Sequence, residues 1–150
     1  MSKDDFDKFV DQLQKELMQK ELMEYNKTIV NLFHNPKNWG KLPESEISIS
    51  ESYKGPCGDT MQYFLNIDGN IIKKATFITD GCGASVATAS QTTILITSKT
   101  LEYAEKLTPE DIDKAVDGLP DDHKHCADLS IRTLRRAIAK YRKNQKSKME

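Results

Sequence analysis

The chain has 150 residues, and its 22 basic and 23 acidic side chains leave a net charge of −1. This length predicts a single domain, residues 1–150, with a sizeable core, and the balanced charge gives no overall field that would favour nucleic acid or a membrane. The first ten residues carry no apolar signal core, and no segment approaches the roughly 18 apolar residues that a membrane span needs. Three cysteines are too few for a disulfide framework, so a reducing cytoplasm is the expected compartment.

Residues 1–33 have the spacing of helices, and the first 25 are predicted to be an N-terminal helical extension. A second helical run reaches Phe33 and ends at a turn that contains Pro36 and Gly40. The apolar side chains of the first run recur every three or four residues: Phe6, Phe9, Val10, Leu13 and Leu17.

The middle of the chain alternates between apolar and polar residues, which is the pattern of strands with one face in water. Residues 47–53 and 61–67 have it, and residues 71–80 are predicted to be the returning strand. Asp68-Gly69 favours a tight hairpin between the second and third runs, because both residues tolerate a positive φ. These segments predict a three-stranded antiparallel β-meander.

The last part of the chain returns to helical spacing. A helix rich in small residues follows Gly83, and residues 98–107 predict a short helix. Thr108 has the character of an N-cap, with Pro109 at the first helical position, and Gly118 ends that helix. The final helix has its apolar stripe at Ala127, Ile131, Leu134, Ile138 and Tyr141.

The predicted fold class is therefore α+β, with the three-stranded antiparallel meander packed against several α-helices and an additional N-terminal helix. Residues 144–150 are predicted to be a flexible basic tail.

All three cysteines fall at junctions between predicted elements. Cys57 lies in a loop between strands, and Cys82 and Cys126 lie at the starts of helices, where unpaired N–H groups lower a thiol pKa. Asp59 follows Cys57 by two residues, which places both side chains on one side of an extended backbone. His125 precedes Cys126. These five residues are the candidate ligands for tetrahedral zinc or an iron–sulfur cluster.

Structural explanations compete with this interpretation. A single cysteine is most often a small buried apolar residue, and the shaping of turns is a sufficient explanation for the glycines beside Cys57 and Cys82. His34 is interpreted as the end of a helix, and His123 as an exposed residue beside two aspartates. The coincidence of three junction thiols favours a metal or thiol-chemistry site.

Three segments in order then resemble a known family, the U-type iron–sulfur cluster assembly scaffolds, which include IscU and the N-terminal domain of NifU. The segments are "HNPKNWG", "CGDTMQYFLNIDGNIIKKATFITDGCGASVATAS" and "HCADLSIRTLRRAIAKY". The resemblance covers roughly residues 26–143.

The resemblance implies a scaffold, not an enzyme, that builds a transient cluster, typically 2Fe–2S, and hands it to recipient apo-proteins. It implies a cysteine desulfurase as the source of persulfide sulfur, together with donors of iron and electrons. By position, Cys57, Cys82 and Cys126 match the cluster cysteines, and Cys126 matches the first persulfide acceptor. Asp59 matches the aspartate that makes the cluster labile, and His125 matches the histidine beside the last cysteine.

Physical reasoning adds three expectations to this resemblance. Asp59 or His125 would be a weaker fourth ligand than a thiolate, Cys126 would have a low pKa, and the glycines flanking Cys82 would leave room for a partner's cysteine.

The chain departs from the family in two places. Family members that use a dedicated Hsp70 chaperone carry an "LPPVK"-like segment, whereas this chain has "LPDDHK", so such a chaperone is a doubtful partner. The N-terminal extension lies outside the usual short form and would serve docking or formation of a homo-oligomer.

Two other functions stay open at this point. The first is a zinc-binding sulfurtransferase of the same fold, which relays persulfide and holds zinc at the same ligands. Members of that branch generally lack a histidine beside the last cysteine, so His125 favours the scaffold. The second is a structural zinc domain or a plain interaction module.

Overall fold

A computed structural model describes residues 2–149 of the chain. Six α-helices, two 3₁₀ helices (η1 and η2) and three strands follow one another within these residues. In chain order they are α1 (Lys3–Glu24), α2 (Lys27–His34), η1 (Glu44–Glu46), β1 (Ile49–Lys54), β2 (Thr60–Asp68), β3 (Ile71–Thr79), α3 (Gly83–Ile96), α4 (Leu101–Lys106), α5 (Pro109–Ala115), η2 (Asp121–His123) and α6 (His125–Met149).

The three strands form one antiparallel sheet in the order β1-β2-β3, which confirms the predicted meander. Asp68 pairs with Ile71, so the hairpin turn is Gly69-Asn70, one residue later than predicted. Gly69 has a φ of 64°, a conformation that glycine adopts without strain. On β2 every second side chain from Met61 to Ile67 is buried, as the alternation predicts, and Phe64 on the opposite face is buried as well.

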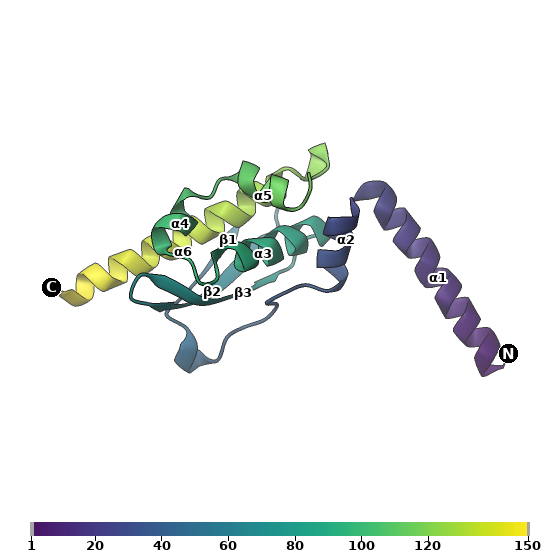
Figure 1. Ribbon diagram of the computed structural model, residues 1–150, viewed down its shortest axis with the longest axis horizontal. Helices are drawn as coiled ribbons and strands as arrows, with labels where there is room; N and C mark the ends of the chain where they lie inside the picture. Colours follow the sequence, from purple (N-terminus) through teal and green to yellow (C-terminus); the bar gives the residue numbers. More distant parts are fainter. Residues whose placement is uncertain (1, 150) are drawn as a thin grey trace.

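Helices α3 and α6 lie along the sheet and form a second layer that packs against it. Helix α3 packs on β3 and α6 packs on β1 (Figure 1). The core between the layers is apolar, and its largest fully buried side chains include Tyr63, Phe77, Met61, Leu65, Ile72, Ile96, Leu134 and Ile138. The chain thus has the α+β architecture that its periodicities predict.

Hydroxyl groups form a buried polar seam between α3, α6 and the sheet. Ser130 of α6 lies within hydrogen-bonding distance of the Tyr63 hydroxyl, and its Oγ lies 2.9 Å from the Oγ1 of Thr92. Thr92 also donates to the carbonyl of Thr88 at 2.7 Å. All four side chains lie inside the protein. Buried hydroxyls are tolerated here because each has a partner.

Replacing Ser130 with alanine is expected to lower the free energy of unfolding by about 1–3 kcal/mol, because the Tyr63 hydroxyl would be left buried without a partner. Urea denaturation measures this loss. The Ser130→Ala/Tyr63→Phe double variant removes both partners, so its loss should be smaller than the sum of the two single losses. Strict additivity would mean that the seam does not couple these residues.

The N-terminal helical region breaks at Tyr25-Asn26, where α1 ends and α2 begins. Asn26 is the N-cap of α2, and its Oδ1 accepts a hydrogen bond from the Ile29 N–H at 2.9 Å. Its amide nitrogen donates to the carbonyls of Val116 and Gly118 at 2.9 and 2.8 Å. Asn26 therefore fixes the start of α2 against the end of α5, across a sequence separation that periodicity does not reveal.

Helix α1 projects from the rest of the molecule (Figure 1). None of its side chains, all within the described part of the chain, is buried. Its predicted apolar stripe therefore faces outward, and the exposed members include Phe6, Phe9, Leu13 and Leu17. Self-association through this extension stays a prediction.

The remaining terminal features differ partly from expectation. The capping box of α5, formed by Thr108 and Asp111, confirms the predicted N-cap. Helix α6 continues to Met149, so residues 144–149 are helical where a flexible tail was predicted, and Glu150 lies outside the described residues. No helix within residues 2–149 is both long enough and apolar enough to cross a membrane.

Candidate functional site

The loop between β1 and β2 positions Cys57 and Asp59. The Gly55 N–H donates to the Asp59 carbonyl at 2.9 Å, and the Gly58 N–H donates to the Gly55 carbonyl at 3.0 Å. Gly58 has a φ of 92°, which an L side chain rarely adopts. The two candidate ligands are therefore brought together by a tight turn, whereas the sequence analysis assumed extended backbone. Cys57 is exposed at the loop tip.

The other two cysteines lie at helix starts. Cys82 is the N-cap residue of α3 and is half-buried, and Cys126 lies in the first turn of α6 and is fully buried. Their Sγ atoms are 4.0 Å apart. Ser85, on the first turn of α3, donates its hydroxyl to the Cys126 Sγ at 3.4 Å.

The potential ligands form two groups of three. Cys82, His123 and Cys126 have ligand atoms that all lie within 4.8 Å of one another, and the same holds for Cys57, Asp59 and His125. The Nε2 of His125 lies 3.7 Å from the Sγ of Cys126, so the two groups adjoin. The structure thus gathers the five predicted residues into one region and adds His123.

His123 is the residue that the sequence interpretation missed. Its side chain is 15% exposed, so the expectation of an exposed histidine was wrong. The Nδ1 of His123 lies 3.7 Å from the Cys82 Sγ, whereas the neighbouring Lys124 turns away and pairs with Asp113 at 3.0 Å. A signal was present, because His123 precedes the His125-Cys126 pair by two residues. Its direction depends on η2, however, which the sequence pattern does not predict.

The two thiols at the helix starts differ in their electrostatics. The Cys126 thiol donates a hydrogen bond that lowers the pKa of Cys82 to about 4, and this effect and the backbone N–H groups of Ser85 and Ala84 outweigh burial. Conversely, the hydrogen bond to Cys82 and burial raise the pKa of Cys126. The expected low pKa at Cys126 was therefore wrong, and the low pKa belongs to Cys82. A shared proton gives one thiolate and one thiol, which helix position alone does not predict.

Alkylation of the reduced, metal-free protein tests this assignment. Cys82 should react with iodoacetamide at a nearly constant rate between about pH 5 and pH 8, because its thiolate is already formed. In Cys126→Ala the donated hydrogen bond is absent, so the rate at Cys82 should rise with pH over that range. Peptide mass mapping resolves Cys82 from Cys57. A steep pH dependence of Cys82 in the unmodified chain would contradict the assignment.

The glycines beside Cys82 make room for the chain's own side chains. A Cβ at Gly81 would lie 2.6 Å from the Ser85 Oγ and 3.0 Å from an Asp59 carboxylate oxygen. A Cβ at Gly83 would lie 3.2 Å from the ring of Phe33. The expectation that these glycines leave room for a partner's cysteine stays a prediction. Gly81 allows Asp59 and α3 to approach each other closely.

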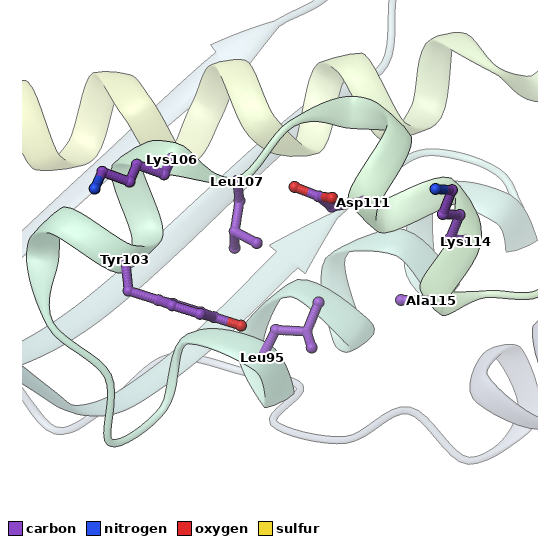
Figure 2. Close-up of a pocket in the computed structure, with 7 residues that line it drawn as sticks. All are labelled: Leu95, Tyr103, Lys106, Leu107, Asp111, Lys114 and Ala115. Carbon is purple, nitrogen blue, oxygen red and sulfur yellow. The ribbon is translucent and has the colours of Figure 1, made fainter.

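Two hollows in the surface help to delimit the site. A hollow of about 90 Å³ lies beside Cys57 and His125, so solvent reaches the second group of donors. A larger pocket of about 540 Å³ lies among Leu95, α4 and α5 (Figure 2). Its lining has no thiol or imidazole, and the Asp111 carboxylate accepts from the Thr108 N–H at 2.9 Å in the capping box. The larger pocket is therefore not the candidate site.

The donor chemistry of the two groups suits metals that prefer sulfur. Two sulfurs with one imidazole, and one sulfur with a carboxylate and an imidazole, are combinations that bind zinc or the irons of a cluster. Thiolates favour such metals over magnesium or calcium, which take oxygen ligands. The site is therefore a candidate centre for zinc or an iron–sulfur cluster.

Solved structures share the fold. A protein of Fervidobacterium islandicum, described as a putative iron–sulfur cluster assembly scaffold for the SUF system, superimposes with a TM-score of 0.63 over 78% of this chain and 98% of its own, at 22% identity. A NifU-like N-terminal protein of Brucella abortus superimposes with a TM-score of 0.63 over 80% of this chain and 95% of its own, at 16% identity. At these identities the similarity shows the fold.

Relatives with higher identity carry names from one family. The iron–sulfur cluster assembly scaffold protein IscU 1 of Archaeoglobus fulgidus is 37% identical over 123 residues, which are 81% of this chain and 80% of the relative. The IscU scaffold protein of Aquifex aeolicus is 33% identical over 79% of this chain and 76% of its own. The family model of the NifU-like N terminal domain matches residues 24–148, and the chain therefore belongs to that family.

Proposed function

We propose that this chain is a scaffold on which a transient iron–sulfur cluster is assembled and from which the cluster passes to recipient apo-proteins. The observation that carries the proposal is the pair of adjoining donor groups, which contain three sulfurs, one carboxylate and two imidazoles. The names of the IscU relatives support it. The cluster is cargo, and the chain acts as a carrier that performs no catalytic turnover of its own.

The composition of the donor set suits temporary binding. A cluster held by four buried thiolates stays bound, whereas oxygen and nitrogen ligands exchange with protons and bind iron more weakly than sulfur does. Asp59 and His125 supply such ligands, and Cys57 beside them is exposed, so that group is open to solvent. We propose a 2Fe–2S cluster, with Cys57, Cys82 and Cys126 as its cysteine ligands and Asp59 or His125 as the fourth ligand.

Sulfur is proposed to arrive as persulfide from a cysteine desulfurase, with iron and electrons from other donors. In the transfer step an acceptor thiolate attacks the outer sulfur of the desulfurase persulfide, a new S–S bond forms, and the desulfurase cysteine leaves as a thiolate. Cys126 is the proposed acceptor. Because Cys126 is buried and Cys82 holds the thiolate in the metal-free fold, transfer requires the Cys82–Cys126 contact to open and Cys126 to lose its proton.

Reconstitution tests the scaffold function. The reduced protein is incubated anaerobically with ferrous iron, cysteine and a desulfurase, and then with an apo-ferredoxin. Visible sulfur-to-iron charge-transfer bands that move to the ferredoxin are expected. Mass mapping after reaction without iron should place the extra sulfur on Cys126, and persulfide confined to Cys57 would contradict that assignment.

A zinc-binding sulfurtransferase of the same fold is the second candidate. It is favoured by one observation, the compact group of two cysteines and His123, whose spacing is close to that of zinc ligands. A colourless protein that keeps one zinc ion, accepts persulfide and yields no transferable cluster would support this relay function and contradict the scaffold proposal.

A further inference from the structure

His123 occupies the position of a metal ligand that the predicted set does not contain. Its Nδ1 lies 3.7 Å from the Cys82 Sγ, and the Cys82 Sγ lies 4.0 Å from the Cys126 Sγ. A tetrahedral zinc ion, with bonds of about 2.3 Å to sulfur and about 2.0 Å to nitrogen, separates two sulfur ligands by about 3.8 Å and a sulfur from a nitrogen by about 3.5 Å. The observed separations are within about 0.2 Å of these values.

The far side of the His123 ring has the partner that a ligating histidine needs. Its Nε2 lies 3.2 Å from the Oε1 of Glu24, at the end of α1, and 3.5 Å from the Tyr25 hydroxyl. The Tyr25 ring packs against the imidazole with the centroids 5.2 Å apart. A carboxylate that accepts from one ring nitrogen fixes the tautomer and leaves the other nitrogen as a ligand. Glu24 therefore holds Nδ1 toward the sulfurs.

A second pair in the same region shows the same chemistry without the thiols. The Nε2 of His34, on α2, contacts the Oε2 of Glu21 at 2.5 Å, one turn before Glu24 on α1. His34 belongs to neither of the two potential metal groups among the described residues. At His123 the nitrogen that does not contact the glutamate faces the Cys82 sulfur, whereas His34 lies in neither metal group. The Glu21–His34 pair therefore serves as an internal control for the Glu24–His123 pair.

We propose that Cys82, His123 and Cys126 form a divalent-metal site of the zinc type, in which His123 is a ligand and Glu24 is a positioning residue. The site uses two sulfurs and one nitrogen and leaves one position open. It shares Cys82 and Cys126 with the proposed cluster ligands and adds His123 to them. The inference concerns binding of a single metal ion by the isolated chain, so it does not depend on whether a cluster is assembled.

This inference gives α1 a role at the site. The matched NifU-like domain begins at residue 24, and the end of α1 at Glu24 and the C-cap Tyr25 both contact His123. The last residue of α1 therefore orients the His123 imidazole, and the Glu24 carboxylate connects this exposed helix to the metal group.

Titration of the full-length, reduced protein with Co²⁺, followed by competition with Zn²⁺ and a chromophoric chelator, tests the proposal. The spectrum should show a tetrahedral ion with two thiolate ligands. His123→Ala should weaken Zn²⁺ binding by at least about 100-fold, and Glu24→Gln by about 10-fold, at the lower end of the range for partners of metal-ligating histidines. His34→Ala and Glu21→Gln are the matched controls and should leave the affinity unchanged.

A second variant with a stronger expected cobalt spectrum keeps the test valid if His123→Ala fails to fold. His123→Cys should bind Co²⁺ with a stronger thiolate-to-cobalt band, because a third sulfur replaces the nitrogen. Unchanged affinity and spectrum in His123→Ala would overturn the proposal, and so would Cys57→Ser weakening the single-metal site as much as His123→Ala does. A chain that binds Zn²⁺ as predicted but forms no transferable cluster would contradict the proposed scaffold function alone.

Discussion

Replacing Cys82 with serine is expected to abolish retention of the reconstituted cluster. Cys82 is the half-buried member of its group, lies 4.0 Å from Cys126 and carries the thiolate in the metal-free fold. A serine hydroxyl is nearly the same size but is a poor ligand for iron that prefers sulfur. Loss of this ligand should shorten the cluster lifetime by at least roughly 100-fold, beyond the range typical for outer-shell partners.

Decay of the visible absorption after desalting measures that lifetime, and bound iron and sulfide provide an independent count. Serine is a favoured N-cap residue, so α3 should still start at the same position. Lys124→Ala is the control, since Lys124 lies beside the His125-Cys126 pair but pairs with Asp113 and not with a thiol. A Cys82→Ser protein that melts like the unmodified chain and still keeps its cluster would remove Cys82 from the ligand set.

The fold was largely predictable because its signals are local. Alternation marked the first two strands, and the hairpin that leads into the third was found from Asp68-Gly69 to within one residue. The N-cap at Thr108 was predicted from residues adjacent in sequence. The tertiary contact of Asn26 was not predictable because it is not local: the Asn26 amide donates to two carbonyls that lie about ninety positions further along the chain.

The site was predicted less completely for the same reason. The five predicted residues carry recognisable motifs, and the structure places them in two adjoining groups. The orientation of His123, by contrast, depends on Glu24 and Tyr25, nearly one hundred positions earlier. In the sequence, Cys82 and Cys126 have the same pKa-lowering position at a helix start, and the low pKa was expected at Cys126 because of its implied role as sulfur acceptor. The contact between the two sulfurs couples their pKa values, and the backbone N–H groups at Cys82 together with the burial of Cys126 decide which thiol keeps the proton.

Replacing Asp59 with alanine is expected to slow the loss of the cluster. The Asp59 carboxylate lies in one group with Cys57 and His125, and the absence of a side chain at Gly81 lets it approach α3. A carboxylate is a hard ligand that a proton or a water molecule displaces readily, so an iron bound through it is the point from which the cluster comes apart. Without the carboxylate, His125 is left as the non-sulfur ligand in that group.

The lifetime of the Asp59→Ala cluster should increase about tenfold, which corresponds to about 1.4 kcal/mol in the barrier to release. Absorption decay in the presence of a chelator measures spontaneous loss, and transfer to apo-ferredoxin should slow in parallel because both processes open the same ligand. Asp68→Ala is the matched control. Asp68 is an exposed aspartate at the last residue of β2, whereas Asp59 directly precedes the first residue of that strand. Faster loss from Asp59→Ala would show that the carboxylate holds the cluster, and the source of lability would then have to lie in the exposed Cys57 loop.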